Sequence, residues 1–209
     1  MRNRDEDGGG LHTLDLAAGS VTEGIIHYLS GGAQAGSAGE RQLAALLNHR
    51  VQGLALVRDP VEADLPLEQL RSVLRYWKGL PQVAGVPDIM RVAPEALLAA
   101  LGYIMLIGIE ERSGDLRYAL YGSKIAEVAG FDMTGKSVWD IPTTSPIQTF
   151  FAACYMAARQ LKCALYTVHK APPSITVSHW HRIILPMGAG GEVKRFLVCN
   201  MPIKDGELQ

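Results

Sequence analysis

Length, composition and charge exclude several classes of protein. The 209 residues are 48% hydrophobic and 20% charged, which is typical of a soluble chain with one or two domains. The 20 Lys and Arg residues nearly balance the 21 Asp and Glu residues, and neither sign forms a run, so we expect no nucleic-acid partner. The chain opens without a signal-peptide core and never approaches the ~18–20 consecutive apolar residues of a membrane span. We therefore expect a cytoplasmic protein without a membrane segment.

Residues 1–66 are expected to form an N-terminal extension that is partly disordered and partly helical. Residues 1–14 are polar and Gly-rich, so we expect them to be disordered. Two short helices are predicted to follow. Each is marked by a serine and a glutamate with capping-box spacing ahead of apolar residues: Ser20 with Glu23, and Ser37 with Glu40.

A folded domain is predicted over residues 67–209, beginning with an amphipathic leading helix at 67–79. Four apolar residues recur in it at i, i+3, i+4 and i+7, the spacing of one helix face. They are Leu70, Val73, Leu74 and Trp77. Two roles are open for this stripe, because it either packs against the protein's own sheet or forms the seam of a homodimer.

The remaining elements follow in an order that predicts an α+β domain. Pro94 suits the first position of a short helix, and Pro146 opens a longer helix with one apolar stripe. A short helix is expected at 123–129, and strands are expected at 103–110, 116–121, 163–170, 174–186 and 193–202. We therefore predict a five-stranded antiparallel sheet with helices on one face.

A phosphate-loop pattern occurs in the middle of the chain. The G-x-x-x-x-G-K-[ST] positions are filled by Gly130, Gly135, Lys136 and Ser137. In a nucleotide-binding enzyme this loop follows a strand and opens a helix, so that its N–H groups and lysine surround the phosphates. Here the upstream residues have helical spacing, and Pro142 limits any helix downstream. The context favours a turn, with a nucleotide-binding enzyme as the alternative interpretation.

The same region resembles a known family signature. Residues 117–123, RYALYGS, and residues 130–136, GFDMTGK, resemble the RYRLVGT and GxDLTGR segments of a family of small bacterial PAS-like proteins. The resemblance covers residues 67–203, and flanking segments agree in their order: Tyr76-Trp77, Pro87-Asp88-Ile89 and Ile183-Ile184-Leu185-Pro186. The chain departs from the family at Ala119, where arginine is usual, and at Gly108, where an acidic residue is usual.

The resemblance implies a PAS-like fold and a non-enzymatic sensory or regulatory role in signal transduction. Such a protein binds a small molecule or a protein partner, and the resemblance names neither a ligand nor a cofactor. Leading helices of PAS-like proteins often form dimer seams, so a homodimer is expected. No kinase, cyclase or DNA-binding segment accompanies the domain, so we expect the signal to pass through the leading helix and the extension to a protein partner.

Seven residues are candidates to line a ligand cavity between the predicted sheet and its helices. They are Tyr118, Ile125, Val128, Phe131, Phe150, Cys154 and Tyr166. The alternative is that they fill a dry core, since aromatic and aliphatic residues at these spacings also do that. In that case the protein is a structural protein–protein adaptor.

Catalytic and metal-binding patterns are weak. His179 and His181 alternate on one predicted strand, so their rings project from the same face about 7 Å apart, with His169 as the nearby third candidate. No cysteine or carboxylate completes the set at ligand spacing, so no metal site is predicted. The chain lacks a G-x-S-x-G elbow, and no catalytic residues can be named. The three cysteines, including Cys163 and Cys199, lie in apolar surroundings and favour reduced thiols over a disulfide framework.

Overall fold

The computed structural model describes residues 8–31, 38–47, 50–88, 93–173, 175–204 and 206–207. The expectations for residues 1–7, for a cap at Ser37 and for the motif position Ile89 lie outside the described residues. Within them, helices and strands follow one another from Gly8 to Ile203.

The centre of the structure is a six-stranded antiparallel sheet with the strand order β1-β6-β7-β8-β4-β5. Its strands are β1 (Ala55–Arg58), β4 (Ile104–Ile109), β5 (Leu116–Leu120), β6 (Leu165–Lys170), β7 (His179–Ala189) and β8 (Glu192–Ile203). A separate ribbon pairs β2 (Gln82–Val83) with β3 (Val86–Pro87). The predicted hairpin and the three C-terminal strands are confirmed, although β7 begins later than the predicted residue 174.

The sixth strand, β1, comes from the segment that was expected to be an N-terminal extension. It pairs with β6 at the edge of the sheet, where Leu56 lies opposite Thr167 and is buried. A strand of four residues gives too short an alternation to be recognised from the sequence. The five-stranded prediction is therefore one strand short.

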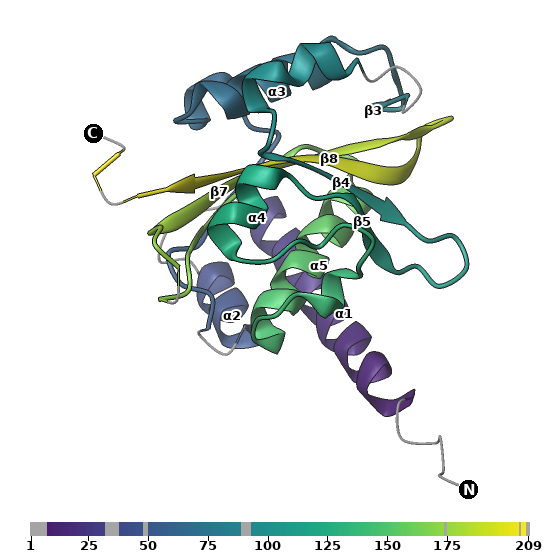
Figure 1. Cartoon of the computed structure of the whole chain (residues 1–209). Coiled ribbons are helices and arrows are strands. Elements are labelled where there is room, and N and C mark those ends of the chain that lie inside the picture. The colour runs from purple at the N-terminus through teal and green to yellow at the C-terminus, as the bar shows by residue number, and fades with distance from the viewer. Residues whose placement is uncertain are drawn as a thin grey trace, which may run out of the picture.

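Helices cover both faces of the sheet, rather than the single face predicted (Figure 1). One face carries α1 (Gly8–Ser30), α2 (Ala38–Leu46), α4 (Ser123–Ala129) and α5 (Ser145–Leu161), and the other carries α3 (Glu68–Gly79) and the 3₁₀ helix η3 (Pro94–Ala100). Two shorter 3₁₀ helices are η1 (Glu62–Asp64) and η4 (Val138–Asp140). The central strands require two covers, because Ile184 joins the core on the α5 side while Ile183 and Leu185 join the core on the α3 side.

The N-terminal segment packs into the same core as the rest of the chain. Residues 8–14 are helical rather than disordered, and α1 continues through Ser20, which is therefore not a helix cap. Ile25 of α1 lies in one buried cluster with Leu56 and with Phe150 of α5. This burial outweighs the low helix propensity of the glycines in α1. In the described part of the chain, no helix combines the length and the apolarity needed to cross a membrane.

The apolar stripe of α3 is buried within the single chain and does not form an exposed dimer seam. Leu70, Val73 and Leu74 are fully buried, and Trp77 is 5% exposed. The Trp77 indole N–H donates a 2.8 Å hydrogen bond to the carbonyl oxygen of Pro186 on β7. Of the two roles weighed for the stripe, packing on the protein's own sheet is the one that the structure shows. The dimer-seam role of the stripe is wrong because β7 and β8 are buried on both faces and need α3 as a cover. Whether the protein forms a homodimer through another surface stays a prediction.

We expect Trp77→Ala to lower the free energy of unfolding by about 3–5 kcal/mol, because it removes a buried indole from the α3 side of the sheet. Chemical denaturation measures this loss. Leu98→Ala is the control, since Leu98 on η3 is 65% exposed and its truncation should change stability by less than about 0.5 kcal/mol. The dimer-seam interpretation would be restored if Trp77→Ala left the stability unchanged and light scattering showed that a parent dimer had become a monomer.

Candidate functional site

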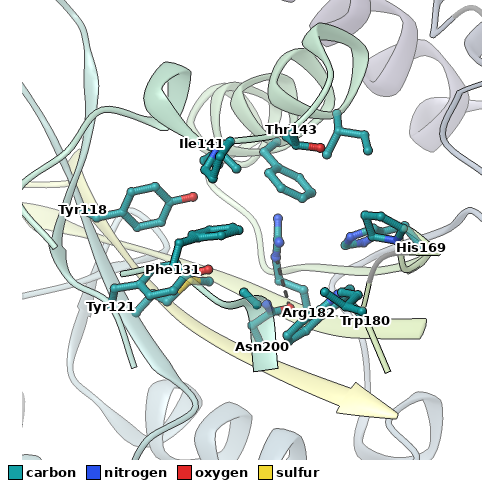
Figure 2. A pocket seen from close by; sticks show the side chains of 16 residues that line it. Tyr118, Tyr121, Phe131, Ile141, Thr143, His169, Trp180, Arg182 and Asn200 are labelled. Carbon is teal, nitrogen blue, oxygen red and sulfur yellow. Dashed lines mark hydrogen bonds between the residues drawn. The ribbon is translucent and has the colours of Figure 1, made fainter. Parts of the chain in front are cut away.

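A pocket of about 280 Å³ lies between the sheet and the helices on the α5 side (Figure 2). We call it the central pocket. Most of the side chains that line it are apolar or aromatic, with a small number of polar groups among them, and this is the usual composition of small-molecule sites. They are Met105, Tyr118, Tyr121, Ala129, Phe131, Ile141, Pro142, Thr143, Ile147, Phe151, His169, Pro172, Ile175, Trp180, Arg182 and Asn200.

Strand alternation and pairing place four residues on the floor of the central pocket. Trp180 and Arg182 are two positions apart on β7, so they project from the same face. His169 of β6 pairs with Trp180, and Asn200 of β8 pairs with Arg182. Directly opposite residues in an antiparallel sheet share a face, so all four side chains leave the sheet on the pocket side.

Two glycines position the segment that covers one end of the central pocket. Gly122 precedes α4 where the chain passes close to Gly102, and a Cβ at Gly122 would lie 2.2 Å from the Gly102 carbonyl oxygen. Gly130 ends α4 with φ of 81°, a left-handed conformation that glycine adopts without a steric penalty. The turn brings Phe131 to the pocket, where its ring centroid lies 6.2 Å from that of Tyr121.

Arg182 brings a buried positive charge into the central pocket. The residue is 4% exposed, and its Cζ lies 4.0 Å from the centroid of the Phe151 ring. Its Nε donates a long, 3.4 Å hydrogen bond to Oδ1 of Asn200, whereas Nη1 has no hydrogen-bond partner. Among the described residues, no carboxylate lies within ion-pair distance of the guanidinium. An unpaired buried charge costs several kcal/mol, so a large electrostatic penalty is concentrated at this point.

His169 lies beside Arg182 and is neutral. The imidazole is 3% exposed, its centroid is 5.2 Å from that of Phe151, and its Nδ1 has no hydrogen-bond partner. Burial, and secondly the charge of Arg182, hold the pKa of His169 well below its ordinary value. A neutral imidazole with a free ring nitrogen can donate or accept one hydrogen bond to a bound molecule.

Tyr118 and Tyr121 contribute neutral phenols to the same space. Their rings meet edge to face with centroids 5.3 Å apart. Burial raises the pKa of both hydroxyls above the ordinary value, so both stay protonated near neutral pH. Arg182 is therefore the one charged side chain among the described residues that line the central pocket.

The seven residues proposed from the sequence as cavity lining divide into three groups. Tyr118 and Phe131 do line the central pocket. Three others, Ile125, Phe150 and Cys154, are buried in the core without lining it, and Val128 packs against that core. Tyr166 lies on the opposite face of the sheet, in the core under α3. Tyr166 is two positions from Val168, the partner of His181, and its hydroxyl is 2.6 Å from Nδ1 of His181.

The polar floor of the central pocket was not recognised from the sequence. A charged residue inside the apolar run of β7, at Arg182, was the available signal, because buried arginine needs a partner or a function. The same strand register shows how the three histidines weighed as metal ligands lie. His169 faces the central pocket, whereas His181 projects from the other face, so the three histidines do not converge. No group of three metal-binding side chains is found among the described residues.

A model of the PAS domain family matches residues 67–198, more than half of the chain. The chain belongs to the PAS domain family. PAS domains are typically sensory and without enzymatic activity, and the fold described above agrees with this family. No curated protein and no solved structure matches the chain. α1, α2 and β1 precede the matched residues and add a helical layer and an edge strand to the PAS domain.

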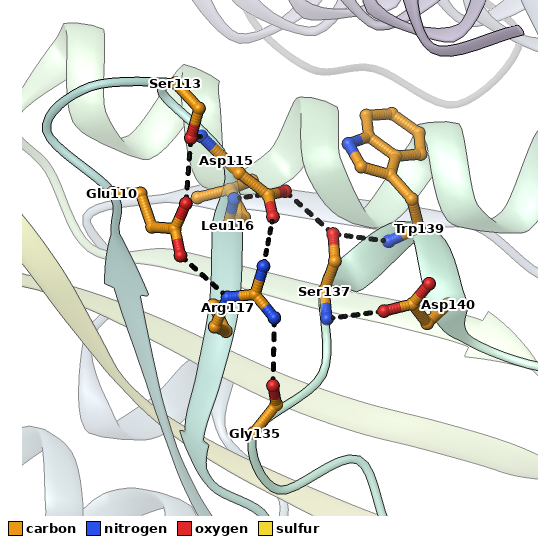
Figure 3. Close-up of polar contacts among 9 residues, drawn as sticks. All are labelled: Glu110, Ser113, Asp115, Leu116, Arg117, Gly135, Ser137, Trp139 and Asp140. Atoms are coloured by element: carbon orange, nitrogen blue, oxygen red, sulfur yellow. Dashed lines mark hydrogen bonds and ion pairs between the residues drawn. The ribbon is translucent and has the colours of Figure 1, made fainter. Parts of the chain in front are cut away.

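The β4–β5 hairpin of the PAS domain carries an exposed polar network around Arg117 (Figure 3). The Arg117 guanidinium donates from Nε to Oε1 of Glu110 at 2.8 Å and from Nη1 to the carbonyl oxygen of Gly135 at 2.9 Å. Its Nη2 lies 3.3 Å from Oδ2 of Asp115. Arg117 therefore ties the hairpin to the turn that contains the phosphate-loop pattern.

The phosphate-loop pattern forms a structural turn in this PAS domain. It is preceded by α4 and followed by η4, the reverse of the strand and helix that phosphate binding requires. Ser137 Oγ donates to Oδ1 of Asp115 at 2.7 Å and accepts from the Trp139 backbone N–H, so it caps η4. Lys136 Nζ donates to the carbonyl oxygen of Asp132 at 2.9 Å. Both side chains are engaged by the protein, in a geometry that does not surround a phosphate.

We expect Ser137→Ala to destabilise the protein by about 1–2 kcal/mol, because it removes the η4 cap and leaves Asp115 without its hydroxyl donor. Lys136→Ala is the matched control at the neighbouring position, where the side chain is exposed and the change should be below about 0.5 kcal/mol. Thermal and chemical melts measure both. ATP or GTP binding by the parent protein that disappears in Lys136→Ala would show that the pattern holds phosphate after all.

We expect the unfolding free energy to fall as the pH is lowered from about 6.5 toward 4. Burial, and secondly the nearby His179, lower the pKa of His181 to about 4, and burial also lowers that of His169. In this interval the unfolded chain gains protons that the folded chain does not, so the unfolded state is favoured by on the order of 1 kcal/mol per histidine after allowance for solvent screening. Urea melts across the interval measure the slope, and His181→Gln should reduce it. An unfolding free energy that does not change with pH over this interval would contradict the neutral state of His169 and His181 in the folded protein.

Proposed function

We propose that the protein is a cytoplasmic, non-enzymatic PAS sensor that binds a small molecule in the central pocket and passes the signal to a protein partner. The central pocket carries this proposal, because its aromatic and aliphatic walls surround a few convergent polar groups on a rigid sheet. Its volume of about 280 Å³ lies just below the ~300–1,000 Å³ range of ligand pockets, so it suits a small metabolite.

The state of the cysteines supports a reducing compartment. Cys154, Cys163 and Cys199 are all free and buried in the structure. Burial raises the pKa of the Cys154 and Cys199 thiols to about 12, so neither carries the thiolate that a reactive cysteine needs. Buried, unreactive thiols agree with a cytoplasmic protein and favour a ligand sensor over a thiol-based sensor.

The route of the signal is proposed from packing. Ile147 and Phe151 of α5 line the central pocket, and α1 packs along α5. A ligand that changes the position or the mobility of α5 therefore acts on α1, which precedes the residues matched by the PAS family. We propose α1 and the N-terminal segment as the part that a protein partner reads. The α3 stripe is buried, so a homodimer would use another surface.

We expect Ala129→Phe to block the central pocket, because Ala129 lies half-buried at the end of α4 and its added ring would occupy the ligand space. Native mass spectrometry of the intact protein should show a co-purified small molecule that this variant has lost. The cost in unfolding free energy should stay within about 1–3 kcal/mol, the usual range for an added side-chain volume.

Ala119→Phe is the control for the same substitution, since Ala119 is exposed on β5 and does not line the central pocket. It should retain the bound compound. A parent protein that carries no compound, and whose melting temperature no member of a metabolite panel raises, would contradict the sensor function. The adaptor interpretation would then take its place.

A further inference from the structure

Resting on the proposed small-molecule function, we propose that the central pocket binds a monocarboxylate with an apolar body, and that Arg182 pairs with its carboxylate group. Figure 2 shows the Arg182 side chain rising from β7 into the space between Tyr118 and His169. The residue is more than nine-tenths buried, and its Nη1 is without a hydrogen-bond partner. The structure thus contains a cationic donor that faces the cavity and is unsatisfied.

The charge of Arg182 requires a partner from outside the described chain. The guanidinium makes no ion pair with a carboxylate of the described residues, and the neighbouring Asn200 supplies only a neutral oxygen at 3.4 Å. Buried charges are stable when they are paired and hydrogen-bonded. A ligand with one negative charge removes the penalty, whereas a neutral ligand of the same shape leaves it in place.

The orientation of the guanidinium favours a planar carboxylate. The guanidinium lies over the Phe151 ring, with Cζ 4.0 Å from the ring centroid, and its Nε contacts Asn200, so two contacts restrict its orientation. Nη1 has no hydrogen-bond partner, and the Arg182 side chain is among those that line the pocket. A fixed, planar edge of N–H donors matches the two oxygens of a carboxylate and adds geometric selectivity to the charge interaction.

The surroundings of Arg182 indicate a single negative charge on an otherwise apolar molecule. Arg182 is the one charged lining residue, so a phosphate group, which carries about −1.5 to −2 charges near neutral pH, would leave an excess negative charge in a buried site. The walls away from the guanidinium are apolar, and include Met105, Ile141, Ile175 and Trp180. These walls would cover a small aliphatic or aromatic body.

The test compares matched acids and amides on the full chain. Benzoate, phenylacetate and isobutyrate are titrated beside their primary amides and beside inorganic phosphate, by calorimetry and by shifts of the melting temperature. At least one acid is expected to bind the parent protein about tenfold or more tightly than its amide, and phosphate is expected to give no shift.

Two variants connect this preference to the pocket. Arg182→Gln is expected to remove the difference between acid and amide. Arg195→Gln is the matched control, because it deletes the same charge from an exposed position on β8 and should preserve the difference. If Arg182→Gln does not fold, Arg182→Lys replaces it. The lysine keeps the charge without the planar fork, so each acid should bind about tenfold more weakly while the preference for acid remains.

The outcomes separate this inference from the function on which it rests. Equal binding of acid and amide by the parent protein, a preference for phosphate, or no response to any of the acids would overturn the carboxylate assignment. A co-purified neutral compound found by native mass spectrometry would then leave the small-molecule function standing. An unchanged acid preference in Arg182→Gln would show that another group recognises the anion, and would also overturn the assignment.

Discussion

Two long strands that are buried on both faces determine the arrangement of the whole protein. β7 and β8 pair over nearly their full length, and their apolar side chains alternate between the two cores of the molecule. Because neither face of this pair can be left in water, each needs a cover. α3 covers one face and is held there by the Trp77 hydrogen bond to β7, while α5 covers the other and is backed in turn by α1. The N-terminal segment belongs to the fold for this reason.

The same two strands explain where the central pocket lies. Ile184 and Val198 meet the helices of the α5 side with apolar side chains and pack closely. Arg182 lies two positions from Ile184 on β7, and its partner Asn200 lies two positions from Val198 on β8. Both face the same helical layer with polar groups, whose hydrogen bonds the apolar side chains of α5 cannot supply. A helix that packed tightly over this point would bury the guanidinium with nothing to pair it. The gap in packing and the unpaired charge are therefore two consequences of one local feature.

The sequence predicted those features that depend on a long, regular period, and it missed those that depend on strand register. The stripe of α3, the apolar face of α5 and the β4–β5 hairpin repeat over enough residues to be recognised, and so does the α+β class. β1 is too short to show a recognisable alternation. The pocket floor is set by the pairing of Arg182 with Asn200 and of His169 with Trp180, which no local pattern encodes. Cys154 and the other predicted lining residues that lie in the core are apolar or aromatic, and residues of this type fill cores more often than they line sites.

A sensor needs a free-energy difference between its empty and occupied states, and under the function proposed for this PAS domain the buried charge supplies that difference. An apolar cavity alone gains similar amounts from many apolar molecules, because burial of surface is not directional. A guanidinium in contact with Phe151 and Asn200 discriminates more strongly between ligands. A neutral isostere of the ligand leaves a buried donor unpaired, and this lowers the affinity far more than the loss of one methylene group does. Phe151, which holds the charge in place, belongs to α5, the helix on which α1 packs. Under the proposed function, a bound anion would act on the packing of α5 through Phe151, and we propose that the N-terminal helix transmits this change.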